Sequence, residues 1–257
     1  MTEENGVFEV DGAGLAWRRT PGAGPTILWL GGFASDMTGT KAQALADWAA
    51  AQGRDFLRFD YFGHGASGGS FREGTITRWR TDALAVIDAL TEGPVVLVGS
   101  SMGGWIACLA ALSRPKRVKA IALIAPAPDF TEKLLKPTLP PEALAAISET
   151  GEWAPPSPYG DGYPITKVLL EDGGRWSILD AAIAINVPVR ILQGGMDDTV
   201  PHGHALHLAT ALEGEDVVFT LIKDGDHRLS RPQDLARLVA TVAELTGPFS
   251  RRGEGNL

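Results

Sequence analysis

The stretch VVLVGSSMGGWIA, residues 95–107, places two serines among glycines at the end of an apolar run. Residues 94–99 are almost continuously apolar, which is typical of a strand buried on both faces, and residues 102–113 have apolar side chains at helical spacing. Between them, Gly99 to Gly103 matches G-x-S-x-G, the pattern of a strained turn that exposes a nucleophile. Ser101 occupies the central position, so we predict Ser101 rather than Ser100 as the nucleophile. The alternative is a structural turn whose glycines only let two backbones approach closely.

The same alternation of apolar runs and helical segments continues on both sides of this turn. Strands are predicted at 26–30, 56–60, 94–99, 118–124, 188–193 and 217–222, and helices at 38–52, 77–91, 102–113, 201–212 and 232–245. The segments 6–10 and 14–19, joined by DGAG, predict an antiparallel hairpin at one sheet edge. The pattern predicts an α/β fold with a mostly parallel sheet covered by helices on both faces.

One long segment interrupts this alternation. Residues 126–186 are rich in proline, glycine and aromatic residues, and a structureless loop of that length is improbable within a compact domain. We therefore expect a core of residues 1–125 and 187–246, a small cap formed by 126–186, and a frayed tail over 247–257.

Composition excludes several classes of partner. The net charge of −8 argues against nucleic acid and anionic membrane surfaces, which need a basic surface, and no apolar run approaches the length of a membrane span. The single cysteine, Cys108, lies in an apolar segment and is interpreted as a buried hydrophobic residue. The acidic beginning MTEENGVFEV lacks a signal or transit pattern, so we expect a cytoplasmic protein.

A serine hydroxyl needs a general base that is oriented by a carboxylate. After the strand at 188–193, the sequence GGMDDTVP offers two acids, and we predict Asp197, four residues before the proline, as the orienting one. Asp198 is interpreted as a capping or solvated acid. His227 follows the next strand in the turn DGDH, at the same carboxyl edge of the sheet, and is the predicted base.

The other histidines and the oxyanion donors complete the set of candidates. His202, His204 and His207 crowd one helix start, where a solvated surface is a better interpretation than a metal site. His64 precedes the turn and is interpreted as structural. An oxyanion needs backbone donors from the residue after the nucleophile and from the loop after an early strand, which predicts Met102 and Phe33.

Six segments in this order and spacing resemble the α/β-hydrolase family: GGFASDMTGTKA, RFDYFGHGASGG, VGSSMGGW, ALIAPAPDF, QGGMDDTVP and DGDHR. The resemblance covers about residues 23–245 and is strongest to the branch of mitochondrial acyl-protein thioesterases that are also acyl-glucuronide esterases. It implies the α/β-hydrolase fold, Ser101 as nucleophile with Asp197 and His227, no cofactor, and hydrolysis of small-molecule or acyl-protein esters and thioesters through an acyl-enzyme.

The cap should supply the acyl pocket, because an insertion at this point lies above the carboxyl edge of the sheet. About half of its aromatic residues are expected to form the cap's own core, and some apolar surface should still face the substrate. Five aromatic residues are candidates for the lining of this pocket: Phe130, Trp153, Tyr159, Tyr163 and Trp176. Their apolar surface predicts a preference for medium or long acyl chains.

Two other functions compete with a serine hydrolase. A non-catalytic binding or scaffold protein can use the same fold, although such a protein normally lacks a member of the triad. A dehalogenase or epoxide hydrolase would have an aspartate in place of Ser101. The sequence leaves acyl length, leaving group and oligomeric state open.

Overall fold

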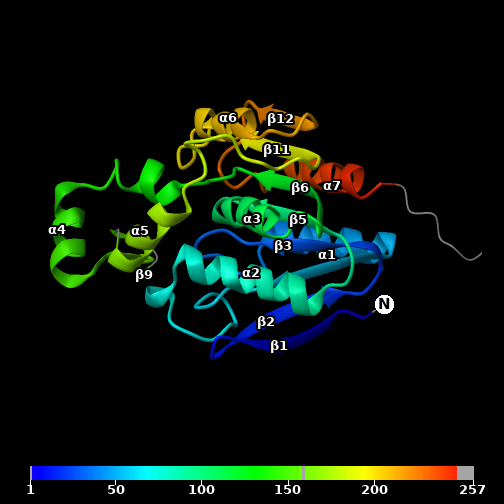
Figure 1. The fold of residues 1–257 in the computed structure, drawn as a ribbon, viewed down its shortest axis with the longest axis horizontal. Helices are drawn as coiled ribbons and strands as arrows, with labels where there is room; N and C mark the ends of the chain where they lie inside the picture. The colour runs from blue at the N-terminus through cyan, green and yellow to red at the C-terminus, as the bar shows by residue number, and fades with distance from the viewer. Residues whose placement is uncertain (1, 155, 158–159, 248–257) are drawn as a thin grey trace, which may run out of the picture.

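An eight-stranded sheet forms the centre of the molecule (Figure 1). The structure is a computed structural model that describes residues 2–154, 156–157 and 160–247. The strand order is β1-β2-β4-β3-β5-β6-β11-β12, and the strands from β4 to β12 are parallel to one another. Their bounds are β1 Glu4–Val10, β2 Ala13–Thr20, β3 Ala23–Leu30, β4 Arg54–Phe59, β5 Val95–Ser100, β6 Val118–Ile124, β11 Val189–Gly194 and β12 Val217–Ile222.

Helices cover both faces of this sheet. On one face, α1 (Thr40–Gln52) and α7 (Pro232–Thr246) share a hydrophobic cluster with the strands. The other face is covered by α2 (Ile76–Leu90), α3 (Met102–Ser113) and α6 (His202–Ala211). The predicted fold class is confirmed, and the antiparallel hairpin β1–β2 forms one edge of the sheet as expected.

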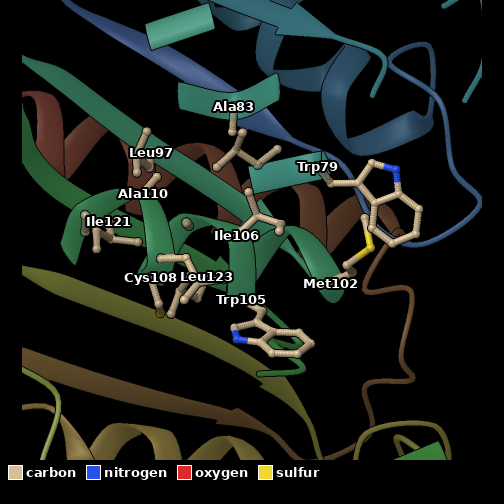
Figure 2. Packing of buried hydrophobic residues seen from close by; sticks show 14 of the residues in the cluster. Trp79, Ala83, Leu97, Met102, Trp105, Ile106, Cys108, Ala110, Ile121 and Leu123 are labelled. Carbon is tan, nitrogen blue, oxygen red and sulfur yellow. The ribbon is translucent and has the colours of Figure 1, made fainter. Parts of the chain in front are cut away.

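The helix α3 lies in the middle of the larger cluster (Figure 2). Trp105, Ile106 and Cys108 are fully buried, because this helix packs against strands on one side and against α2 on the other. Burial raises the pKa of the Cys108 thiol to about 12, which leaves it protonated and unreactive at neutral pH. The segment after the G-x-S-x-G turn is thus anchored in the core, and this anchoring fixes the turn itself.

In its described residues, the chain between β6 and β11 adds no strand to the main sheet. It forms η2 (Thr131–Leu135), α4 (Pro141–Thr150), β7 (Glu152–Trp153), β8 (Pro156–Ser157), β9 (Gly160–Asp161), β10 (Ile165–Thr166), α5 (Lys167–Gly173) and η3 (Gly174–Trp176). These elements gather at one end of the sheet, on the left in Figure 1. Of the predicted frayed tail 247–257, only Gly247 is among the described residues.

Candidate active site

The turn at Ser101 joins β5 to α3 with a backbone that only close packing can hold. Ser101 has φ 53° and ψ −118°, an uncommon conformation for a residue with a side chain. A Cβ on Gly99 would lie 2.4 Å from the Gly103 carbonyl oxygen, and a Cβ on Gly103 would lie 2.0 Å from that of Leu30. The two glycines are therefore required for the turn.

The two serines of the turn differ in burial and in the cavities that they line. Ser100 ends β5 and is buried, with 7% of its surface exposed, whereas Ser101 is half-buried. Ser101 lines two cavities, and Ser100 lines only one of them. A substrate spanning both cavities would therefore pass Ser101.

The predicted acid and base lie together at the carboxyl ends of β11 and β12. Asp197 Oδ2 accepts a hydrogen bond from His227 Nδ1 at 2.9 Å, and its side chain is fully buried. Asp197 Oδ1 accepts from the amides of Thr199 and Val200 at 3.0 and 2.8 Å. Burial opposes ionisation, but these hydrogen bonds outweigh it and hold the pKa of Asp197 below its usual range.

This arrangement assigns the protons of the histidine. An ionised carboxylate can only accept, so His227 donates from Nδ1 and keeps the Nε2 lone pair free to take a proton. His227 and Ser101 line the same cavity. Asp198, the neighbouring acid, is exposed and has a contact with Thr199 Oγ1 at 3.3 Å.

The loop after β3 passes directly beside Ser101. A Cβ on Gly32 would lie 3.5 Å from Ser101 Cβ, so the backbone at Gly32 and Phe33 is next to the Ser101 side chain. Met102 is the first residue of α3, where an amide has no acceptor within the helix. Both predicted oxyanion donors, Phe33 and Met102, are thus adjacent to Ser101.

An apolar cavity of about 450 Å³ opens at Ser101. Two of the predicted pocket residues, Phe130 and Tyr163, line this cavity. Tyr159 lies outside the described residues. Its lining is Phe33, Ala34, Ser101, Met102, Ala127, Phe130, Leu134, Leu135, Gly162, Tyr163, Ile165, Thr199 and Val200.

Two of the predicted pocket aromatics have other contacts. Trp153 packs into a small cluster within the insertion, beside Ile165. The indole N–H of Trp176 donates to Thr77 Oγ1 at 2.7 Å, and its ring stacks under the guanidinium of Arg80 on α2. Neither Trp153 nor Trp176 lines the two cavities at Ser101, because these contacts turn them toward the insertion's own core and toward α2.

The structure gives His64 a place in the site that its sequence position does not reveal. His64 Nδ1 donates to the carbonyl of Phe62 at 3.1 Å, so Nε2 is an acceptor and receives the amide of Ala34 at 3.2 Å. Ala34 has φ 56°, and it follows the oxyanion candidate Phe33. Burial lowers the pKa of His64, which keeps the ring neutral and suited to accept this bond.

A buried carboxylate supports the loop that contains His64. Asp82 accepts hydrogen bonds from the amide of Phe62 and from Arg78 Nε, both at 2.9 Å, and burial raises its pKa from 3.8 to about 6. An acid with a raised pKa in the folded state binds protons more tightly there than when unfolded, so this group stabilises the fold as the pH falls through about 6.

We expect this contribution to be measurable by comparison with Asp82→Asn. Lowering the pH from 7.5 to 5 should increase the free energy of unfolding of the wild type by about 1.4 kcal/mol relative to the variant, since the variant has no proton to bind at this position. Urea titrations at the two pH values give the difference. An equal pH response in both proteins would contradict the raised pKa.

Known proteins match this chain over most of its length. A model of the serine aminopeptidase S33 family matches residues 25–159. The mouse protein named palmitoyl-protein thioesterase ABHD10, mitochondrial, is 37% identical over 238 residues, which are 92% of this chain and 80% of that protein. The chain belongs to the α/β-hydrolase family. It is a serine hydrolase, and the fold resemblance stated from its motifs is confirmed.

Solved structures agree with this α/β-hydrolase assignment. A putative hydrolase from Agrobacterium vitis is 43% identical, has a TM-score of 0.91, and is matched over 96% of this chain and 100% of its own. The mouse α/β hydrolase domain-containing protein 10 is 35% identical, with a TM-score of 0.86 and coverage of 94% and 98%. The insertion is included in these matches, because they extend over nearly the whole chain.

The expected cytoplasmic location is wrong on this comparison, since the mouse, bovine, rat, orangutan and human relatives are all named as mitochondrial proteins. The compartment of a protein depends on short targeting segments that an import machinery recognises. Neither the fold nor the composition of a folded domain indicates it. Among the described residues, no helix is long and apolar enough to cross a membrane.

Proposed function

We propose that this hydrolase cleaves carboxylic esters and thioesters of medium or long acyl chains through an acyl-enzyme on Ser101. One observation supports it above all: the strained residue Ser101 lines a cavity together with His227, which is bonded to the buried carboxylate of Asp197. A binding or scaffold protein would have no need of a nucleophile, a base and an orienting acid in this relation.

The proposed reaction has two halves. Ser101 Oγ attacks the acyl carbonyl while His227 Nε2 takes its proton, and Asp197 stabilises the imidazolium that forms. The amides of Phe33 and Met102 donate to the oxyanion of the tetrahedral intermediate. The leaving alcohol or thiol takes the proton from His227, and a water molecule then repeats the sequence to release the acid and restore Ser101.

The apolar cavity supports the assignment of an acyl chain. Phe130, Leu134, Leu135 and Ile165 come from the chain between β6 and β11, and the cavity at about 450 Å³ is within the usual size of ligand pockets. We propose residues 126–186 as a cap whose inner face holds the acyl group, over a core of residues 1–125 and 187–246. The relatives named palmitoyl-protein thioesterases support a long acyl chain and admit an acyl-protein as well as a small substrate.

An acyl-chain series tests this assignment. From acetyl to octanoyl p-nitrophenyl esters, and in matched thioesters, kcat/KM should rise by up to about four-fold per methylene, since each buried methylene contributes at most about 0.8 kcal/mol. Amides of the same chains should be poor substrates. A maximum of kcat/KM at the acetyl ester, with no hydrolysis of thioesters, would contradict the acyl-chain assignment but not the assignment as a hydrolase.

Two variants make the series specific to this cavity. Leu134→Trp fills it and should move the optimum to shorter chains, because Leu134 is a lining residue. Leu144→Trp is the matched control on α4, where the leucine is 49% exposed and outside the lining. An equal shift in both variants would show that the cavity does not select the chain.

A further inference from the structure

A second cavity, of about 430 Å³, opens at Ser101 and His227 and extends to the beginning of α1. It shares Phe33, Ala34 and Ser101 with the apolar cavity, so the two meet at the nucleophile and the oxyanion loop. The two substituents of a carbonyl diverge from its carbon atom. If the acyl chain occupies the apolar cavity, the leaving group must therefore lie in this second one.

Two cations line the second cavity. Lys41 Nζ donates to the backbone carbonyl of Arg228 at 2.5 Å, which holds both residues at the same wall. Over the described part of the chain, neither side chain has a carboxylate within salt-bridge distance. Burial lowers the pKa of Lys41 to about 8, with Arg228 adding to the effect and Asp226 opposing it, so the ammonium is charged at neutral pH but poorly solvated.

Further donors lie at the same wall without acceptors. Trp29 lines the cavity with only 4% of its surface exposed, and its indole N–H has no acceptor among the residues the structure describes. The helix α1 begins at this wall as well, after Gly39, with no side-chain cap and no acidic residue in its first turn. Buried donors and an uncapped helix beginning both favour an anionic acceptor.

Of the described residues that line this cavity, Asp36 alone carries a carboxylate. Its Oδ1 atom accepts from the amide and the hydroxyl of Thr38, at 2.7 and 2.5 Å, so it is engaged locally. The cavity thus presents two cations against one carboxylate, in a protein whose net charge is −8. A positive wall in a negative protein points to a ligand rather than to general surface charge.

We infer that this cavity is a leaving-group subsite for a carboxylate or phosphate, and that Lys41 and Arg228 bind that anion. The inference rests on the proposed function, because it assumes that Ser101 is acylated. It adds a determinant of specificity on the side of the ester or thioester bond opposite to the acyl chain.

The test compares substrates that share an octanoyl chain. The carboxylate arm pairs the ester of 3-carboxy-4-nitrophenol with that of 4-nitrophenol, and the phosphate arm pairs octanoyl-coenzyme A with the octanoyl thioester of N-acetylcysteamine. In at least one arm, the wild type should show a higher kcat/KM for the anionic member. Lys41→Met should reduce that ratio by about ten-fold, the usual effect of losing a hydrogen bond to a charged group, and Arg228→Gln should reduce it by a smaller factor because Arg228 is exposed.

The design separates the possible failures. The ratio of the two kcat/KM values does not depend on the concentration of folded enzyme, so it can be measured for a destabilised variant as well. Lys116→Met removes the same charge at an exposed site and should leave the ratio unchanged. If the neutral ester is hydrolysed by the wild type but both ratios are near one and unaffected by Lys41→Met, the subsite is wrong and the proposed function stands. If Ser101→Ala hydrolyses the neutral ester as fast as the wild type, the proposed function itself fails.

Discussion

Ser101→Ala is expected to lower kcat on medium-chain esters by on the order of 10⁴-fold or more, which is the usual loss when the nucleophile of a triad is removed. The variant should fold normally, because the turn depends on Gly99 and Gly103, whose close contacts exclude any side chain. Alanine at φ 53° is no less able than serine to adopt the strained backbone of position 101. The measurement is kcat under saturating octanoyl ester, with circular dichroism as a check on folding.

The matched control is Ser100→Ala. Ser100 is buried at the end of β5, and its hydroxyl has no part in the proposed reaction, so this variant should keep most of the activity. If the two effects were exchanged, the nucleophile would be assigned one residue too late.

Asp197→Asn is expected to lower kcat by roughly 10³- to 10⁴-fold. The two backbone amides that bond Asp197 Oδ1 can still bond the asparagine oxygen. The asparagine NH₂ group would then replace Oδ2, where it faces His227 Nδ1 and Gln193 Nε2. A donor at this position forces the imidazole into the tautomer that carries its proton on Nε2, which cannot accept a proton from Ser101.

Asp198→Asn is the control for this variant. Asp198 is exposed, and its side-chain contact is with Thr199 Oγ1, so the expected change in kcat is small. Steady-state kinetics of the two variants on one ester measure both changes in kcat. A larger loss in Asp198→Asn would place the acid one residue later than we have it.

The strands and helices of the core were predictable because their apolar patterns repeat with the periods of strand and helix. The turn at Ser101, the two acids after β11 and the histidine after β12 could be placed at one sheet edge by chain order alone, since parallel strands bring their carboxyl ends together. The pairing of His227 with Asp197 then follows from two adjacent strands, β12 and β11.

The structure of the segment between β6 and β11 was less predictable, because its short proline-rich elements have no long apolar period that would show which side chains are buried. Trp176 and Trp153 looked like pocket residues in the sequence, yet an indole ring serves equally well to anchor the insertion to α2 or to fill its own core. The lining includes the aliphatic residues Leu134, Leu135 and Ile165, which the aromatic pattern did not single out.

Contacts between distant loops could not be predicted from the sequence either. His64 bonds the amide of Ala34 across 30 residues of chain, and Lys41 bonds the carbonyl of Arg228 across 187. Neither contact has a local motif, because each depends on how two loops from different strands approach at the sheet edge. Only the three-dimensional arrangement shows that these residues belong to the neighbourhood of Ser101.

Labelling with a fluorophosphonate shows whether Ser101 is the nucleophile. The wild-type protein is treated with the probe, digested with trypsin, and peptide 81–116 is fragmented between the two serines. We expect one adduct, on Ser101 of the wild type, and none when Ser101→Ala is treated in the same way. An adduct on Ser100, or no adduct on the folded wild-type protein, would contradict it.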